Sequence, residues 1–422
     1  MHSIKFIREN KDLINNTLLN KKSDINLDEI LDIDFKRRTL IQEVENLKAN
    51  RNTINSKMSL MKKENKDCDS LISDMKNISV KIKALDNDLN VFNLSLNEKL
   101  MYIPNIIHSS VPKGKSEKDN IVVKEWGDKP SFKFNLLSHL ELCESLNLVD
   151  FKRAAKISGS AFPLYLDKGA KLERSLINYM LDLHTDKHDY REVFPPFLVN
   201  AKSPFTTGNL PKFKDDMYYI ENDDLFCIPT AEVPITNFYS NEVLNEIDLP
   251  KKFAAYSACF RREAGSYGKE TKGLHRLHQF NKVELVKFCN PKDSYSDLNK
   301  LLIDAETVLQ NLNLHYRIIE LCSSDLSFSA AKCYDIEVWS PYERKYLEVS
   351  SCSNFEAFQA RRGNIKYRDK ATNKLEFVHT INGSGLATPR LMIALLEAYQ
   401  TKDGNINLPD PIIQYFGRSI ID

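Results

Sequence analysis

The amino-terminal quarter of the chain contains neither glycine nor proline, the two residues that most readily interrupt a helix. Of the 13 glycines none precedes Gly114, and no proline precedes Pro104. So long an uninterrupted stretch predicts that this quarter of the chain is mostly helical.

Within this stretch, apolar residues recur in alternating steps of four and three, which is the heptad spacing of a coiled coil. One series runs from Leu40 to Met61 with a single polar member, Arg51, and a second runs from Leu71 to Leu96. Only the polar segment 62–70 separates them, so the two helices must pair antiparallel as a hairpin. A second helix of about 30 residues would reach roughly 45 Å at 1.5 Å per residue. The narrow apolar seam favours a solvated rod, over about residues 27–100, rather than a helix packed on a globular domain.

Basic residues are concentrated on the first helix of this hairpin. Residues 36–66 carry nine basic side chains against three acidic ones, whereas the whole chain is nearly neutral with 59 basic and 58 acidic residues. A polyanion would therefore have to be met by this local stripe. Alone the stripe is weak evidence, because charged coiled-coil faces are common and almost no aromatic side chain here could stack on bases.

The composition changes after the hairpin. The stretch 111–130 is polar and includes Pro112, Gly114 and Pro130. This composition predicts a linker at 113–130 with one short strand at 121–123. We therefore divide the chain into an amino-terminal domain (1–112), a linker (113–130) and a carboxy-terminal domain (131–422). The last domain interleaves predicted helices at 171–185 and 294–312 with predicted strands at 193–199, 282–288, 334–339 and 345–349. Because neither GxGxxG nor GxxxxGK[ST] occurs, we predict an α+β fold on an antiparallel sheet flanked by helices.

The composition also restricts the class of protein. A hydrophobic fraction of 42% excludes a wholly disordered chain, and no apolar run approaches the ~18 residues of a membrane helix. The first residues lack an apolar signal core, so we expect a cytoplasmic protein without a membrane partner. The eight cysteines form no CxxC pair, which predicts reduced thiols in the core and no zinc site.

The densest group of reactive side chains follows Phe260. Arg261 and Glu263 precede a loop containing Gly265 and Gly268, and Phe280 and Glu284 follow it. If both flanks are strands, residues two apart share a face, so the four side chains would meet on one surface. A cation, two carboxylates and an aromatic plane suit a nucleotide and a small substrate. From these residues alone, an exposed sheet face with paired charges is an equally good interpretation.

This pattern resembles motif 2 of the class II aminoacyl-tRNA synthetases, which is fRxE, a loop, then (R/H)xxxF. Residues 382–390, NGSGLATPR, look like motif 3, with Ala387 at the third small position. The helix 172–185, followed by a strand ending at Pro195-Pro196, is similar to motif 1, which implies a homodimer interface.

The helical hairpin and three further strings narrow the resemblance to the seryl-tRNA synthetases of bacterial type, over essentially the whole chain. These strings are TGNLP at 207–211, PTAE at 229–232 and EVSS at 348–351. Arg262, where the family often carries serine, and the tip 62–70, which lacks the glycine often found there, depart from the pattern.

The resemblance implies roles for residues around ATP. Arg261 would hold the α-phosphate, Glu263 the adenine amine, and Phe280 and Arg390 the two faces of the base. Arg390 would also hold the γ-phosphate. The implied catalytic residues are Arg261, Glu348 and Arg390, and Glu348 and Ser351 would coordinate Mg²⁺. The complete ATP-binding set is Arg261, Arg262, Glu263, Leu277, Phe280, Glu348, Val349, Ser350, Ser351 and Arg390.

For the amino acid, the resemblance implies L-serine, with Glu284 and Thr380 near its hydroxyl. A pocket that hydrogen-bonds a hydroxyl rejects alanine, because its own polar groups would be left unpaired. The implied serine-binding residues are Thr230, Ala231, Glu232, Arg261, Glu284, Thr380, Asn382 and Ser384.

The implied function is a serine–tRNA ligase, which forms seryl-adenylate from ATP and transfers the seryl group to the 3'-end of tRNA(Ser), with tRNA(Sec) as a further candidate. The helical arm would bind the tRNA through Lys36, Arg37, Arg38, Lys48, Arg51, Lys57, Lys62 and Lys63. Two alternatives are an amino-acid ligase that charges a carrier protein and a noncatalytic RNA-binding relative. The complete arm argues against the first, and the charged residues retained at Arg261, Glu348 and Arg390 argue against the second.

Overall fold

The computed structural model describes residues 2–264 and 272–422, so the predicted loop glycines Gly265 and Gly268 lie outside the described residues. The chain divides into two compact units, Met1–Pro104 and Asn105–Asp422. Each unit has its own architecture, and the catalytic motifs all belong to the second.

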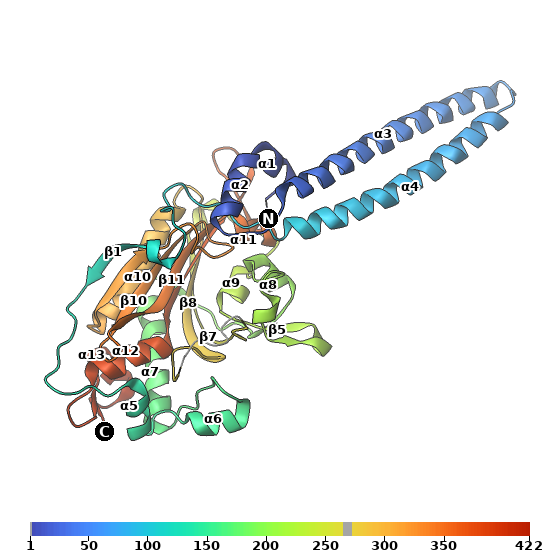
Figure 1. Cartoon of the computed structure of the whole chain (residues 1–422). Coiled ribbons are helices and arrows are strands. Elements are labelled where there is room, and N and C mark those ends of the chain that lie inside the picture. Colours follow the sequence, from blue (N-terminus) through green and yellow to red (C-terminus); the bar gives the residue numbers. More distant parts are fainter. Residues whose placement is uncertain (1, 265–271) are drawn as a thin grey trace. The chain divides into compact units, whose positions relative to one another are not determined.

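The first unit consists of four helices: α1 (Ile4–Glu9), α2 (Lys11–Asn20), α3 (Leu27–Lys63) and α4 (Asp69–Leu100). The side chain of Asn26 begins α3 by accepting hydrogen bonds from the backbone N–H groups of Asp28 and Glu29. The helices α3 and α4 pack along each other as an antiparallel hairpin (Figure 1), which confirms the predicted arm.

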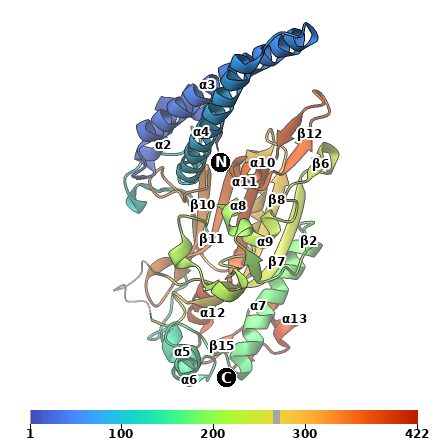
Figure 2. The same cartoon turned by 90° about the vertical axis from the view of Figure 1, so that its right-hand side faces the viewer.

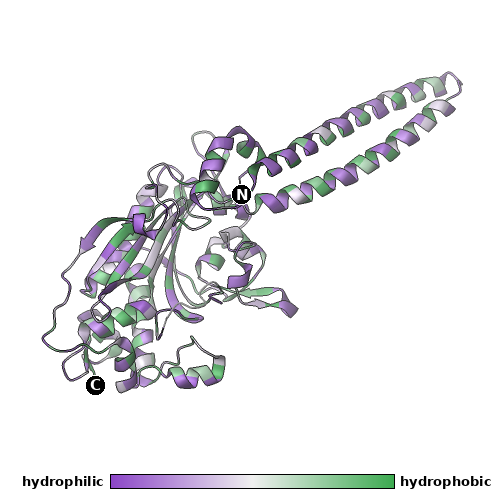
Figure 3. Cartoon of the chain, in the orientation of Figure 1, coloured by the Kyte–Doolittle hydropathy of each residue, from purple (hydrophilic) through white to green (hydrophobic). Residues whose placement is uncertain are grey.

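The apolar seam of the arm lies where the heptads predict it. Every member of the two series, including Arg51, is buried or half-buried. Over residues 40–96 the outward faces are mostly polar, and the large apolar residues exposed among them are Leu60, Ile72, Val80, Val91 and Leu94. Figure 3 shows the resulting alternation of hydrophilic and hydrophobic residues along both helices. Ion pairs join the helices across the seam, such as Lys81 Nζ to Glu43 Oε1 at 2.8 Å and Lys99 Nζ to Glu29 Oε1 at 2.8 Å.

The second unit is organised around an eight-stranded sheet in the order β1-β9-β10-β11-β14-β8-β7-β2. All neighbouring strands are antiparallel except β2 and β7, so the predicted α+β class with an antiparallel sheet is confirmed. The strands are β1 (Ile121–Trp126), β2 (Arg191–Glu192), β7 (Lys251–Phe260), β8 (Gln279–Cys289), β9 (Tyr316–Glu320), β10 (Lys332–Ser340), β11 (Lys345–Glu356) and β14 (His379–Ala387).

Helices cover both faces of this sheet, and strand β8 shows how its sequence divides between them. Val283, Leu285 and Cys289 point into a large core shared with α7 (Asp167–Asp186), α10 (Ser294–Asn311) and α12 (Thr388–Tyr399). Val286 and Phe288 point the other way, into a smaller core with α9 (Glu232–Thr236) and α11 (Phe358–Gly363). Figure 2 shows α9 beside β8 on this second side.

Smaller elements complete the unit. The remaining helices are α5 (His139–Ser145), α6 (Phe151–Ser158), α8 (Lys202–Thr207) and α13 (Asp410–Phe416), with short 3-10 turns at η1 (Glu117–Asp119), η2 (Lys214–Asp216), η3 (Glu221–Asp223) and η4 (Glu246–Asp248). The minor sheets contain β3 (Leu198–Asn200), β4 (Tyr219–Ile220), β5 (Leu225–Cys227), β6 (Val243–Asn245), β12 (Lys366–Arg368), β13 (Leu375–Phe377), β15 (Ile406–Asn407) and β16 (Ile420–Ile421).

Two sequence-based expectations differ from this structure. The predicted strand 193–199 is absent apart from its end in β3, because Pro195 and Pro196 have no backbone N–H for a ladder. The strand before the motif 2 loop ends at Phe260, so Arg261 and Glu263 do not lie on a strand. Across the described part of the chain, no helix is both long enough and apolar enough to span a membrane.

Candidate active site

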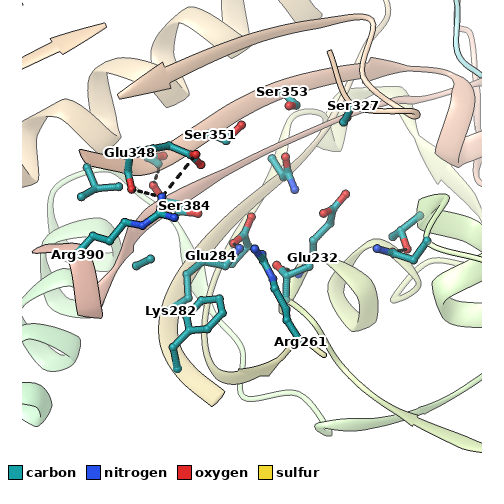
Figure 4. Close-up of a pocket in the computed structure, with 18 of the residues that line it drawn as sticks. Glu232, Arg261, Lys282, Glu284, Ser327, Glu348, Ser351, Ser353, Ser384 and Arg390 are labelled. Carbon is teal, nitrogen blue, oxygen red and sulfur yellow. Dashed lines mark hydrogen bonds and ion pairs between the residues drawn. The ribbon is translucent and has the colours of Figure 1, made fainter. Parts of the chain in front are cut away.

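A cavity of about 460 Å³ opens on one face of β8. Further along the strand, α9 packs on this same face. It collects side chains from β8, β11, β14, the start of α9 and the start of α12 (Figure 4). The segment that resembles motif 2, the segment that resembles motif 3 and the EVSS string therefore meet around one cavity.

Strand alternation explains the floor of this cavity. Phe280, Lys282 and Glu284 occupy alternate positions of β8 and all line the cavity, as the sequence predicts. On the neighbouring strand β14, Ser384 pairs directly with Glu284, and Asn382 lies on the same face.

The glycines of β14 are required by the opposite face of the sheet. A Cβ on Gly383 would lie 2.4 Å from Leu301 Cδ2 of α10, and one on Gly385 would lie 2.7 Å from His184 Nε2 of α7. The absence of these side chains lets both helices pack closely on β14, which fixes the strand that carries Asn382 and Ser384.

Arg261 and Phe280 form one wall. The Arg261 guanidinium lies 5.1 Å from the centre of the Phe280 ring, and its Nε donates to the Pro229 carbonyl at 3.4 Å. Glu263 reaches the same cavity from a left-handed backbone conformation, φ 53°, and pairs with Arg276 at 2.9 Å. The side chains thus converge as expected, although strand alternation is not the reason for Arg261 and Glu263.

Arg390 connects the three motif segments. It lies in the first turn of α12, which begins directly after β14. Its Nε donates to the His275 carbonyl at 3.2 Å, and its Nη1 donates to the Glu348 carbonyl at 2.9 Å and lies 3.6 Å from Glu348 Oε2. Figure 4 shows this side chain directed at Glu348. Two backbone carbonyls thereby fix the guanidinium at the edge of the cavity.

The inner end of the cavity holds a pair of carboxylates. Burial, and then the neighbouring Glu284, raise the pKa of Glu232 to about 7, while hydrogen bonds from Gln359 and Asn382 oppose the rise. Lys282 forms a close ion pair with Glu284, and both side chains are buried. When Glu232 is ionised, two carboxylates therefore face the single ammonium of Lys282, which suits a substrate carrying an ammonium group.

Glu348 and Ser351 of β11 lie beside this cavity and beside an adjoining one of about 740 Å³ that also contains Asp335. Burial, and then Glu348, raise the pKa of the Asp335 carboxyl well above its usual range. A carboxylate and a hydroxyl oxygen are ligands that Mg²⁺ accepts, so this donor set fits the implied metal.

Most of the predicted pocket residues line the cavity, and three do not. Arg262 is exposed outside it, Ala231 is buried in the smaller core, and Thr380 is buried behind it. The predicted residues that line it are Thr230, Glu232, Arg261, Glu263, Leu277, Phe280, Glu284, Glu348, Val349, Ser350, Ser351, Asn382, Ser384 and Arg390.

The basic residues predicted on the arm fall into two groups. Lys36, Arg37, Arg38 and Lys48 each form an ion pair within the first unit, and Arg51 occupies the seam. Lys57, Lys62 and Lys63 are exposed toward the tip of the hairpin.

The sequence interpretation did not assign roles to Lys282, Arg276 and Gln359. Lys282 and Arg276 line the cavity within the motif 2 segments, where their charge was a usable signal. Gln359 belongs to α11 and reaches Glu232 only through the fold, so no spacing could have found it.

One group of side chains could hold a metal ion among the described residues, and it was not predicted. Ligand atoms of His139, His275 and Glu343 lie within 4.8 Å of one another. Glu343 already pairs with His275 and with Lys345, each at 2.5 Å, so its carboxylate is engaged by other groups.

An antiparallel sheet that brings motif 2, motif 3 and the EVSS string around one cavity defines the catalytic domain of a class II aminoacyl-tRNA synthetase. Comparison with known families agrees: residues 212–399 match the "tRNA synthetase class II core domain (G, H, P, S and T)", and residues 1–107 match the "Seryl-tRNA synthetase N-terminal domain".

Individual relatives are similar over their full lengths. The serine–tRNA ligase of Syntrophobacter fumaroxidans is 51% identical over 417 residues, 99% of each chain, and that of Chloroherpeton thalassium is 52% identical over 426 residues, 100% of each chain. The seryl-tRNA synthetase of Pyrococcus horikoshii, solved in complex with ATP, superposes with a TM-score of 0.94 at 36% identity, covering 100% of this chain and 99% of that one.

The chain belongs to the seryl-tRNA synthetase family. It is accordingly an aminoacyl-tRNA ligase with serine as its amino acid. These comparisons favour neither the carrier-protein ligase nor the noncatalytic RNA-binding protein.

Proposed function

We propose that this cavity joins L-serine to ATP as seryl-adenylate, and that the enzyme then transfers the seryl group to the 3'-end of tRNA(Ser). The observation that carries this proposal is the meeting of Arg261, Phe280 and Arg390 with the carboxylates Glu232 and Glu284 in one cavity. Cationic and aromatic groups at one end suit the nucleotide, and the anionic end suits the amino acid.

In the first step, a serine carboxylate oxygen forms a bond to the α-phosphorus while the bond to the departing pyrophosphate breaks. Arg261 would neutralise the charge that develops on the α-phosphate, and Arg390 would hold the nucleotide with Phe280. No side chain is needed as a nucleophile, because positioning and charge stabilisation supply most of the barrier reduction. Glu263 would bind the adenine amine, and its ion pair with Arg276 would have to rearrange to do so.

Glu348 and Ser351 would hold Mg²⁺, since both present oxygen ligands at the border of the cavity. The ion would supply positive charge against the phosphate oxygens.

The amino-acid end selects serine by charge and by hydrogen bonding. We assign the ammonium of serine to Glu232 and its hydroxyl to Glu284, with Asn382 and Ser384 completing the wall. Alanine leaves the hydroxyl partner unpaired, and threonine has to be excluded by its extra methyl group.

The second step requires tRNA, and we assign its binding to the helical arm. A rigid coiled coil with exposed lysines near its tip suits recognition of an RNA duplex by shape and phosphate charge. The tip lysines Lys57, Lys62 and Lys63 are better candidates than the four basic residues held in ion pairs. A homodimer formed through α7 and the following strand, a cytoplasmic location and activity on tRNA(Sec) belong to the same proposal.

Serine-dependent exchange between ATP and pyrophosphate tests the activation step. Exchange is expected with serine and Mg²⁺, and not with alanine, threonine or glycine. Arg261→Ala should abolish exchange while the protein remains folded. Near-normal exchange in this variant would contradict the assigned role of Arg261.

A further inference from the structure

We propose that Gln359 is a positioning residue for serine, whose side-chain amide holds the Glu232 carboxylate in the orientation that receives the substrate ammonium. Thr380 acts behind it by fixing the other end of the amide. This inference rests on the proposed role of Glu232 in serine binding.

The contacts form a continuous chain from the sheet to the cavity. Thr380 Oγ1 donates to Gln359 Oε1 at 2.7 Å, and Gln359 Nε2 donates to Glu232 Oε1 at 2.7 Å. Gln359 and Thr380 are both buried, each only 1% exposed, and neither lines the cavity. They can therefore act on a substrate only indirectly, through the groups of the cavity wall that Gln359 contacts, and of these Glu232 is the charged one.

The amide can point only one way. Nε2 donates both to Glu232 and, at 3.4 Å, to the carbonyl of Thr207, and a backbone carbonyl can only accept. A reversed amide would place Oε1 against this carbonyl and against the carboxylate, which are both acceptors. The donor edge therefore always faces Glu232, so α8, α9, α11 and β14 jointly determine where the carboxylate lies.

The same contact favours the charged form of Glu232. The charged groups and donors around this carboxyl are Glu284 and Lys282 on β8, Asn382 on β14 and Gln359 on α11. Glu284 favours protonation of Glu232, whereas the other three favour the carboxylate. Removing the Gln359 donor should therefore leave Glu232 both less fixed and less often charged.

Gln359→Met, which keeps the length of the side chain and removes the amide, tests this inference. We expect the KM for serine in pyrophosphate exchange to rise roughly 10- to 100-fold, the range for losing a hydrogen bond to a charged group. The KM for ATP should stay near the wild-type value, and the acid limb of the serine profile should move to higher pH.

Thr380 supplies an independent pair of variants. Thr380→Val removes the hydroxyl at nearly constant volume and should raise the serine KM in the same direction by a smaller factor. Thr380→Ser should recover most of the affinity that Thr380→Val loses. If the variants acted only by disturbing the packing, the serine KM would not follow the presence of the hydroxyl, and the pH profile would not shift.

Controls separate failure of this inference from failure of the proposed function. Gln310 supplies a comparable contact on the other side of the sheet, where its Nε2 donates to the Tyr316 hydroxyl at 2.8 Å. Gln310→Met removes this contact and should leave the serine KM unchanged. If Glu232→Gln raises the serine KM but Gln359→Met does not, the positioning role is wrong and the serine site stands. If Glu232→Gln has no effect either, both the positioning role and the assigned ammonium site are wrong.

Discussion

Replacing Gly383 by alanine should damage stability and serine binding together. Gly383 lies on β14 between Asn382 and Ser384, which both line the cavity. Its backbone does not adopt a left-handed conformation, so alanine is excluded here by space rather than by its dihedral angles.

The cost follows from the neighbours of the added methyl group. It would lie 2.4 Å from Leu301 Cδ2 on α10 and 2.8 Å from Cys352 Sγ on β11. Since carbon atoms in contact lie about 3.5–4.0 Å apart, Leu301 would have to retreat by roughly 1 Å or more. Overpacking of this kind costs about 1–3 kcal/mol, and the stiffer unfolded chain returns about 0.4–1 kcal/mol. We expect a net loss of up to about 2.6 kcal/mol. The serine KM should rise severalfold because β14 shifts under both binding residues.

Thermal or chemical unfolding and pyrophosphate exchange measure the two effects, and Leu301→Ala tests the cause. Alone, Leu301→Ala should cost about 2–5 kcal/mol through the cavity it leaves. In the double variant the new methyl group fills part of that cavity, so the combined loss should be smaller than the sum of the separate losses. A Gly383→Ala protein with wild-type stability and serine KM, or strict additivity with Leu301→Ala, would refute the packing argument.

Three further predictions concern function. Deleting residues 40–96 should leave serine-dependent pyrophosphate exchange intact and abolish tRNA charging, and normal charging by the shortened protein would contradict the role of the arm. Arg390→Lys should lower the exchange rate at least about tenfold, because one ammonium cannot reproduce the guanidinium contacts to the carbonyls of His275 and Glu348. Steady-state exchange measures the loss, and an unchanged rate would exclude the proposed role of Arg390 in holding the nucleotide. The KM for serine should fall as pH rises from 6 and level off above about 7, since burial raises the pKa of Glu232 to about 7 and the ammonium requires its charged form; a flat profile measured by exchange across this range would contradict the assignment.

The arm was predictable from the sequence because its structure is local. Heptad spacing determines which side chains of α3 and α4 meet, and the short polar segment between them permits only antiparallel pairing. The face of β8 was predictable for a similar reason, since Phe280 and Glu284 lie four positions apart on one strand and therefore point to the same side.

The remainder of the site depends on contacts between distant segments. Glu263 reaches the cavity through a left-handed turn, and Thr380 faces α11 instead of the cavity. The prediction of a strand at 193–199 was wrong because it followed the apolar composition of the segment and gave too little weight to its two prolines. Gln359 carries no charge and belongs to no motif, so its contact with Glu232 emerges only when α9, α11 and β14 are packed together.

With serine bound by Glu232 and Glu284 as proposed, the inner end of the cavity accounts for a preference for serine over other amino acids. Two carboxylates in a buried pocket repel each other, and burial penalises the charge of each. Lys282 offsets part of this penalty at Glu284, and the donors Gln359 and Asn382 offset part of it at Glu232. Under the proposed assignment, the ammonium of serine lies at Glu232 and its hydroxyl donates a hydrogen bond to Glu284. On this assignment an amino acid without a hydroxyl leaves Glu284 without a substrate partner, so we expect discrimination to depend on both carboxylates and on the amide that orients Glu232.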